Sequence, residues 1–234
     1  MEKRENKTIR FSILWKVKIL DEELLKCYNL KHDYRTKYLQ NKQKRRNEMR
    51  FVVILKQIPD DSIKDEYQDV DQLNDSDKNV IKEALDLRDR YGGTVDVIGF
   101  GPLSAEDVMK ETLTYGIDDA FLISDPQFAD MDVSQVARVV AAGIKKLGPY
   151  DLVLCGRQAI DGDSAHMASM TSCALEIPLI AYSDEITEMK DGSVFAICMG
   201  DQMAYKVEAK TPAMILSIRE KNKNRFPSVP DIMK

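Results

Sequence analysis

A turn rich in glycine and polar residues carries the chemistry that this sequence suggests. The apolar run 151–155 leads into Gly156-Arg157-Gln158-Ala159-Ile160-Asp161-Gly162-Asp163-Ser164, and a helix is expected to begin near Ser164. Glycine lets the backbone approach a ligand closely, a helix N-terminus offers unpaired N–H groups to a phosphate, and Arg157 adds a forked cation. The turn therefore suits an adenine nucleotide.

A purely structural interpretation of the same turn stays open. Asp163 or Ser164 could serve only as a helix cap, with the glycines serving only the turn. No GxGxxG follows a strand and no GxxxxGK[ST] occurs, so the two common nucleotide-binding fingerprints are absent.

Four apolar runs alternate with amphipathic segments, which is typical of a parallel sheet covered by helices. Open sheets of this kind bind ligands at the carboxyl ends of their strands, where the 156–164 turn falls. The expected strands are 51–58, 94–100, 120–124 and 151–155, and the expected helices are 77–91, 104–116, 132–146 and one from about 164.

N-cap signatures mark two of these helices: Ser104 with Asp107, and Asp132 with Gln135. Beyond about residue 178 only strand-like runs follow, and they either extend the same sheet or form a hairpin on its edge; they are 193–199, 203–208 and 212–218. We therefore expect an α/β fold with a Rossmann-like parallel sheet, helices on both faces and a C-terminal antiparallel strand extension. This fold is similar to that of the adenine nucleotide alpha hydrolases.

The composition, 44% hydrophobic and 31% charged, is that of an ordinary globular protein. The sequence has neither a run of about 18 apolar residues nor a signal peptide, so we expect a cytoplasmic protein without a membrane span. Four widely spaced cysteines and two histidines argue against a disulfide framework and against a metal site.

Residues 1–48 form a basic leader, with 14 Lys and Arg against 7 Asp and Glu, and show no sustained helical or strand period. We interpret the leader as disordered or not native, and as no evidence for nucleic-acid binding. Arg45–Met49 can be encoded by a purine-rich ribosome-binding sequence followed by a start codon. We expect the native chain to begin at Met49 and one nucleotide-binding domain to span 49–234, which the N-terminal peptide of native material would test.

The stretch DLVLCGRQAIDGDSA at 151–165 resembles the signature of the electron transfer flavoprotein beta family. Further segments of that family occur in the same order, so that the resemblance covers residues 50–234 and misses the leader. They are VVILKQIPD at 52–60, GFGP at 99–102, ISD at 123–125, TPAMILS at 211–217 and RFPSVPDIMK at 225–234.

In that family the loop and helix start after the fourth strand hold an adenine nucleotide. Carried over by motif, the resemblance implies that the same nucleotide site is formed by Ile54, Leu55, Lys56, Asn74, Asp75, Ser76, Asp77, Phe100, Gly101, Gly156, Arg157, Gln158, Ala159, Ile160, Asp161, Gly162, Asp163, Ser164, Ala165, His166 and Met167.

The resemblance also implies an electron carrier rather than an enzyme, with no catalytic side chain. The chain would pair with an alpha subunit that holds FAD, accept electrons from acyl-CoA or other dehydrogenases, and itself bind AMP or a second FAD. Val229 would lie on the loop that docks partner dehydrogenases. Family members continue beyond the position of Lys234, so we expect a short form without the C-terminal segment.

Two other functions are compatible with the fold. A stand-alone adenine-nucleotide sensor would need no alpha subunit. A hydrolase or ATP pyrophosphatase is disfavoured, because the sequence shows neither a nucleophile with its base nor an SGGxDS-type loop after the first strand.

Overall fold

The computed structural model describes residues 17–19, 48–55, 73, 75–128, 130–157 and 166–218. Within these residues nine strands form one sheet in the order β1-β4-β3-β2-β5-β9-β6-β7-β8. The strands are β1 (Val17–Ile19), β2 (Arg50–Leu55), β3 (Thr94–Phe100), β4 (Asp119–Ile123), β5 (Leu152–Gly156), β6 (Leu179–Lys190), β7 (Ser193–Met199), β8 (Ala204–Lys210) and β9 (Ala213–Ser217). The helices are α3 (Asp75–Tyr91), α4 (Glu106–Thr114), α5 (Val133–Leu147) and α6 (His166–Leu175), with 3-10 turns η3 (Leu103–Ala105) and η4 (Pro126–Phe128).

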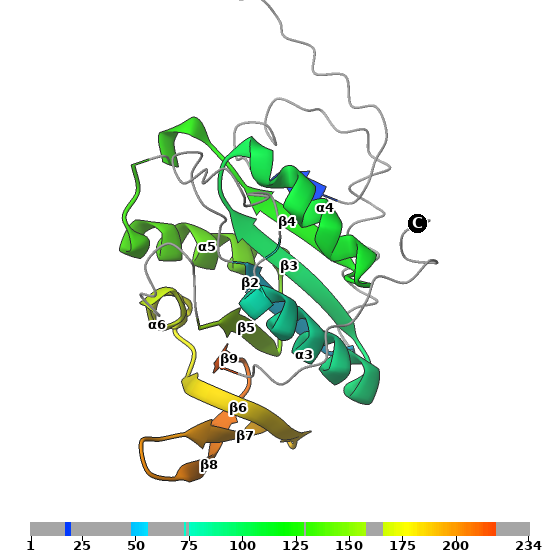
Figure 1. Cartoon of the computed structure of the whole chain (residues 1–234), viewed down its shortest axis with the longest axis vertical. Coiled ribbons are helices and arrows are strands. Elements are labelled where there is room, and N and C mark those ends of the chain that lie inside the picture. The colour runs from blue at the N-terminus through cyan, green and yellow to red at the C-terminus, as the bar shows by residue number, and fades with distance from the viewer. Residues whose placement is uncertain are drawn as a thin grey trace, which may run out of the picture.

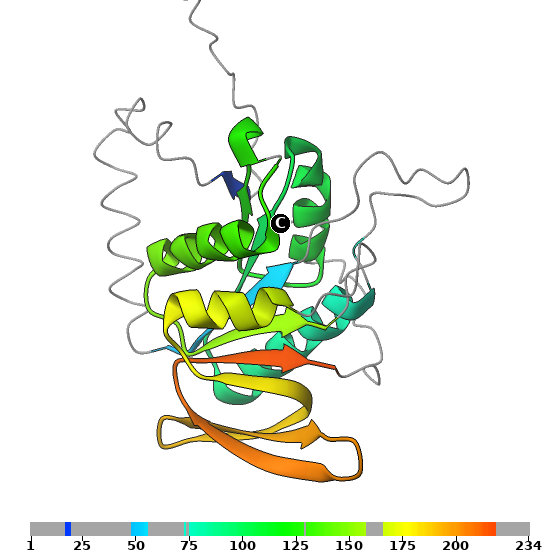
Figure 2. The ribbon, with the colours of Figure 1, turned by 90° about the vertical axis from the view of Figure 1, so that its left-hand side faces the viewer.

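Helices cover both faces of the sheet, as the alternating pattern predicts. Figure 1 shows α3 and α4 in front of the strands, and Figure 2 shows α5 and α6 over the opposite face. Successive side chains of a strand point to opposite faces. In β2, Val53 and Leu55 therefore pack with α3 and α4, whereas Val52 and Ile54 pack with α5 and α6. The predicted α/β fold is confirmed.

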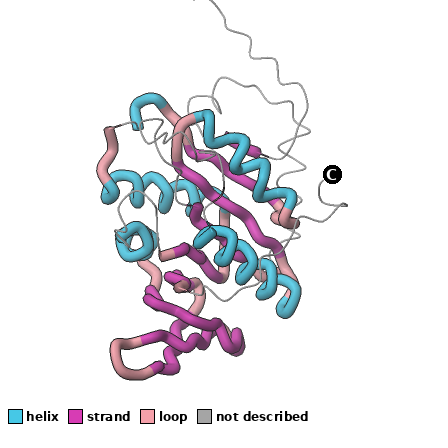
Figure 3. Tube along the Cα trace, in the orientation of Figure 1, coloured by secondary structure: helices cyan, strands magenta, loops and turns pink. Residues whose placement is uncertain are grey.

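The position of β9 decides how the C-terminal part joins this sheet. β9 lies between β5 and β6 and runs parallel to both, while β7 is antiparallel to its two neighbours, β6 and β8. Figure 3 shows these three strands as a separate corner of the molecule. Both alternatives left open by the sequence thus occur: β9 extends the parallel sheet, and the other strands form an antiparallel edge.

Strand β6 is not predicted from the sequence. Its pairing shifts register between Ile180 and Ser183 and again between Ser183 and Glu185. Each shift breaks the two-residue alternation of buried and exposed side chains on which strand prediction depends.

Strand β1 is a second difference, because no strand is predicted in the leader. Val17–Ile19 pair in parallel with β4, with Val17 opposite Ala120. These three residues add a strand at the edge where β4 would otherwise end the sheet.

The two predicted N-caps have different outcomes. The Asp132 prediction is confirmed: its carboxylate accepts a hydrogen bond from the Gln135 amide, and the Gln135 side chain accepts one from the Asp132 amide. The Ser104 prediction is wrong, because Ser104 lies within η3 and the N-cap of α4 is Ala105, which forms no side-chain capping bond. The 3-10 helix η3 adds one turn ahead of α4 that the capping pattern does not reveal.

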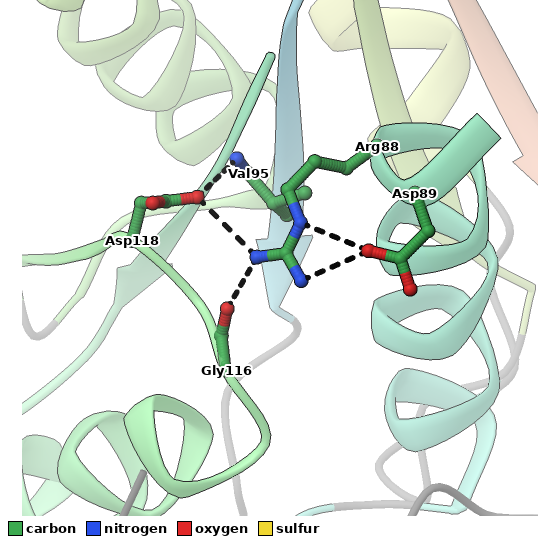
Figure 4. A network of polar contacts seen from close by, with 5 residues as sticks. All are labelled: Arg88, Asp89, Val95, Gly116 and Asp118. Carbon is green, nitrogen blue, oxygen red and sulfur yellow. Dashed lines mark hydrogen bonds and ion pairs between the residues drawn. The ribbon is translucent and has the colours of Figure 1, made fainter. Parts of the chain in front are cut away.

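Polar contacts join the elements at the amino ends of the strands. The Arg88 guanidinium donates to the Gly116 carbonyl at 2.6 Å and lies 3.5 Å from the Asp118 carboxylate, which accepts the Val95 amide at 2.9 Å (Figure 4). Arg50 Nε donates to the buried Asp96 carboxylate at 2.6 Å. These contacts fix α3 and the α4–β4 turn to β3, at the edge opposite the predicted nucleotide site.

No helix in the described part of the chain is both long and apolar enough to cross a membrane.

Candidate functional site

The site is built where β5 ends against the start of α3. Gly156 is the last residue of β5, and a Cβ atom placed on it would lie 2.7 Å from Ser76 Oγ and 3.3 Å from Asp77 Oδ1. A side chain at this position would force the Ser76 hydroxyl to turn away or the first turn of α3 to shift. Two segments that are 80 residues apart in the sequence therefore meet at one close contact.

The first turn of α3 gives this end of the site a negative character. Asp77 is buried, with 1% of its surface exposed, and Ser76 is half-buried beside it. A helix N-terminus stabilises a carboxylate, because the N–H groups of its first turn point toward it. The helix begins at Asp75, and Asn74 lies outside the described residues.

The end of β2 lies beside the end of β5, with Ile54 opposite Cys155. The predicted residues Ile54 and Leu55 are 1% and 5% exposed, and their side chains belong to the two cores on opposite faces of the sheet. Hydrophobic packing thus accounts for these side chains. Lys56 lies outside the described residues.

The end of β3 is joined to the end of β4. The Phe100 ring stacks on Phe128 with 5.7 Å between ring centroids, and the Gly101 amide donates to the Ile123 carbonyl at 3.0 Å. β3 is separated from β5 by β2 alone, so both predicted residues, Phe100 and Gly101, lie at the carboxyl edge that Gly156 also occupies.

The structure describes only the two ends of the predicted nucleotide-binding segment 156–167. Arg157 is exposed after β5, and α6 begins at the exposed His166, with Met167 half-buried. The first turn of α6 contains no acidic residue, so nothing in it offsets the positive end of the helix dipole. The predicted residues from Gln158 to Ala165, and Val229, lie outside the described residues.

Two buried serines extend this edge beyond the predicted residues. Ser217 ends β9 directly opposite Gly156, and Ser183 of β6 lies opposite Ser217. We call Gly156, Ser217 and Ser183 the carboxyl-edge row; all three positions are buried on the α3 face of the sheet. Sequence reasoning missed both serines, because the parallel pairing of β9 with β5 and β6 carries no local signal.

On β7, the strand next to β6, a cysteine follows the carboxyl-edge row. Cys198 of β7 lies opposite Ser183, and burial raises the pKa of this thiol. A raised thiol pKa keeps the group neutral near pH 7, so Cys198 adds no charge to the edge.

Comparison with known proteins identifies relatives along most of the chain. The family model for the electron transfer flavoprotein domain matches residues 64–230. The electron transfer flavoprotein subunit beta of Clostridium acetobutylicum is 39% identical over 196 residues, which cover 79% of this chain and 74% of that protein.

Two further relatives are named as subunits of larger redox systems. The caffeyl-CoA reductase-Etf complex subunit CarD of Acetobacterium woodii is 34% identical, over 79% of this chain and 74% of that subunit. The acryloyl-CoA reductase electron transfer subunit gamma of Anaerotignum propionicum is also 34% identical, over 79% of this chain and 73% of its own length.

Proposed function

Because the chain belongs to the electron transfer flavoprotein family, we propose that it is a beta-type subunit that binds an adenine nucleotide at the carboxyl ends of β2 and β5. Joined to an alpha subunit, it carries electrons from a dehydrogenase through FAD. The nucleotide on the chain itself is AMP or a second FAD.

The close approach of Gly156 to α3 is the observation that carries this proposal. Because Gly156 has no Cβ, the end of β5 can lie in van der Waals contact with Ser76 and Asp77. The contact places the first turn of α3 beside the end of β5 at the carboxyl edge of the sheet, and we call this junction the cradle. Open α/β sheets bind nucleotides at this edge. The residues present therefore fit an adenine nucleotide.

The charges at the two sides of the cradle give the nucleotide a direction. Arg157 and the start of α6 form the positive side, whereas the buried Asp77 in the first turn of α3 forms the negative side. A phosphate is attracted to the first and repelled by the second. The phosphate thus lies toward the 156–167 turn, and the adenosine part extends from there along the carboxyl ends of the strands.

The residues of this chain position the cofactor and take no chemical step themselves. Bound flavin would supply the redox chemistry by taking up and releasing electrons. Arg157 and the amides at the start of α6 would hold the phosphate, and Gly156 would set the depth at which the nucleotide lies.

An exposed apolar corner of the antiparallel edge is the surface we propose for the alpha subunit. Four large side chains gather there, and we call them the hairpin corner: Tyr182, Met199, Met203 and Tyr205, which are 45–58% exposed. Tyr and Met are enriched in the centres of protein interfaces. The β7–β8 turn brings the last three together, since the Gly200 amide donates to the Met203 carbonyl at 2.9 Å.

The electron donor is proposed to be an acyl-CoA or related dehydrogenase. The names of the Acetobacterium and Anaerotignum relatives each refer to a reductase of a CoA ester, which supports an enzyme of CoA-ester redox chemistry as the partner. Val229 is the proposed contact of this chain with that partner.

Coexpression with an alpha subunit of this family, followed by gel filtration and cofactor analysis, tests the proposal. One FAD and one AMP per heterodimer, or two FAD, would support it and would identify the nucleotide of the beta subunit. A heterodimer with neither AMP nor FAD on this chain would overturn it. Nucleotide binding by the chain alone, with no complex formed, would favour the sensor instead.

A further inference from the structure

Ser183 differs from the other buried hydroxyl-bearing residues of the described chain. Its side chain is completely buried, and its Oγ has no hydrogen-bond partner among the residues that the structure describes. By contrast, the buried Ser193 Oγ accepts from Lys210 Nζ at 2.9 Å, and Ser172 Oγ donates to the Ser169 carbonyl at 2.8 Å. A buried hydroxyl without a partner costs free energy, so it needs a functional or structural reason.

The position of Ser183 connects it to the nucleotide site. Ser183 lies opposite Ser217, and Ser217 lies opposite Gly156, so the three residues follow one another across neighbouring strands. Two strand spacings amount to about 10 Å. A nucleotide whose phosphate lies near Gly156 is long enough to extend over this distance along the edge.

The backbone beside Ser183 is strained in a way that places its hydroxyl on this edge. Tyr182 has a φ of 55°, in the left-handed region that a bulky residue rarely adopts, and it lies at the register shift between Ile180 and Ser183. Ser183 is buried on the α3 face, while Tyr182 is exposed. Residues held in such conformations are concentrated at binding and active sites.

We propose that Ser183 is a further binding residue of this site, whose hydroxyl donates a hydrogen bond to an oxygen of the adenine nucleotide lying along the carboxyl-edge row. This inference rests on the proposed function and extends the nucleotide site from β5 across β9 to β6. Nucleotide binding would explain both the unpartnered Ser183 hydroxyl and the strained backbone at Tyr182.

The test compares Ser183→Ala with Ser193→Ala in the full chain, copurified with the alpha subunit. AMP is the probe for calorimetric titration, and thermal unfolding is measured on the same samples without AMP. Ser183→Ala is expected to weaken AMP binding about tenfold, the effect of one lost hydrogen bond, and to leave the melting temperature unchanged or raise it. Ser193→Ala is expected to lower the melting temperature and to leave AMP affinity unchanged.

Ser183→Cys keeps the side-chain shape with a somewhat larger atom and replaces a strong donor by a weak one, so it should weaken AMP binding as the alanine does. AMP affinity equal to that of the wild type in both Ser183 variants would overturn the inference and leave the proposed function intact. A lower melting temperature together with lower affinity would also overturn it, because the hydroxyl would then be bonded within the protein. Failure of the wild-type complex to bind either AMP or FAD would instead overturn the proposed function.

Discussion

At the scale of single residues, the absence of a side chain at position 156 matters as much as any group that is present. Gly156 has the backbone of an ordinary strand residue, so its requirement for glycine comes from the contact with Ser76 and Asp77. Buried charge is the second residue-scale feature. Arg50 and Asp96 form an ion pair in which the arginine side chain is 11% exposed and the aspartate 0%.

Gly156→Ala should lower both the stability of the protein and its affinity for AMP. The added Cβ would lie 2.7 Å from Ser76 Oγ, so the Ser76 side chain must rotate away or α3 must shift from β5. We expect a loss of about 1–3 kcal/mol in the free energy of unfolding and at least a tenfold weaker AMP affinity, measured by urea unfolding and by calorimetry.

Gly143→Ala is the matched control, because its Cβ would lie 2.8 Å from Ile123 Cδ1, between α5 and the sheet and outside the site. It should destabilise the protein without weakening AMP binding. Equal AMP affinity in Gly156→Ala and wild type would contradict the cradle.

Asp96→Ala should be among the most destabilising substitutions in the chain. It leaves the Arg50 guanidinium buried without its carboxylate, which typically costs about 3–5 kcal/mol. Lys110→Ala is the control: it removes exposed pairs with Glu106 at 3.1 Å and Asp107 at 3.0 Å, each of which contributes below about 1 kcal/mol. A similar shift of the urea midpoint in both variants would show that the Arg50–Asp96 pair contributes little.

At the scale of elements, helix ends and strand edges decide how the segments fit together. The start of α5 is closed by reciprocal bonds between Asp132 and Gln135. The outer edge of β4 is covered by β1, which the chain supplies from a segment 100 residues earlier. Both features can be removed by single substitutions.

Asp132→Ala removes the N-cap of α5, and the amide of Gln135 then loses its acceptor. The expected cost is about 1 kcal/mol in the free energy of unfolding. Asp130→Ala, in the exposed turn before the helix, changes the same charge without touching the cap and should have little effect. If chemical denaturation gave equal midpoints for the two variants, the capping box would be energetically unimportant.

Lys18→Pro tests whether the leader covers the sheet edge. Proline lacks the amide donor and has a φ near −65°, which suits a paired strand poorly, so β1 should detach. Amides of β4 in the range 120–122 that are bonded to β1 should then exchange faster with solvent, while Lys18→Ala retains their protection. Unchanged exchange in the proline variant would mean that the leader does not cover β4 in solution.

At the scale of the whole molecule, the antiparallel edge gives one corner of the protein a different character from the rest. The hairpin corner contains four of the seven large hydrophobic side chains that are exposed in the described part of the chain. Concentration of apolar surface at one place is typical of a protein that associates with another subunit.

A Met203→Ser and Tyr205→Ser double variant should weaken the heterodimer by tenfold or more without lowering the melting temperature, since both side chains are over half exposed in the free chain. Leu103→Ser is the control, because Leu103 is 61% exposed but follows β3, far from β8 in the sheet. Analytical gel filtration and titration with the alpha subunit measure the effect. Loss of affinity in the control alone would move the proposed interface to the other end of the sheet.

The sequence by itself determined the parallel half of this protein. The apolar runs at β2, β3, β4 and β5 and the helical spacing between them are local patterns, and the Asp132 cap is a contact between residues three apart. Each can be recognised without knowledge of distant residues. Family motifs in the same segments also indicated the electron transfer flavoprotein family, which the comparisons confirm.

Only the tertiary structure decided which distant segments meet. The contact of Gly156 with α3, the insertion of β9 between β5 and β6, and the burial of Ser217 and Ser183 all depend on pairing across long sequence separations. Strand β6 escaped prediction because its bulges interrupt the alternation, and β1 because three residues are too few to show a period. Non-local pairing and burial are properties of the folded chain, so no window of neighbouring residues records them.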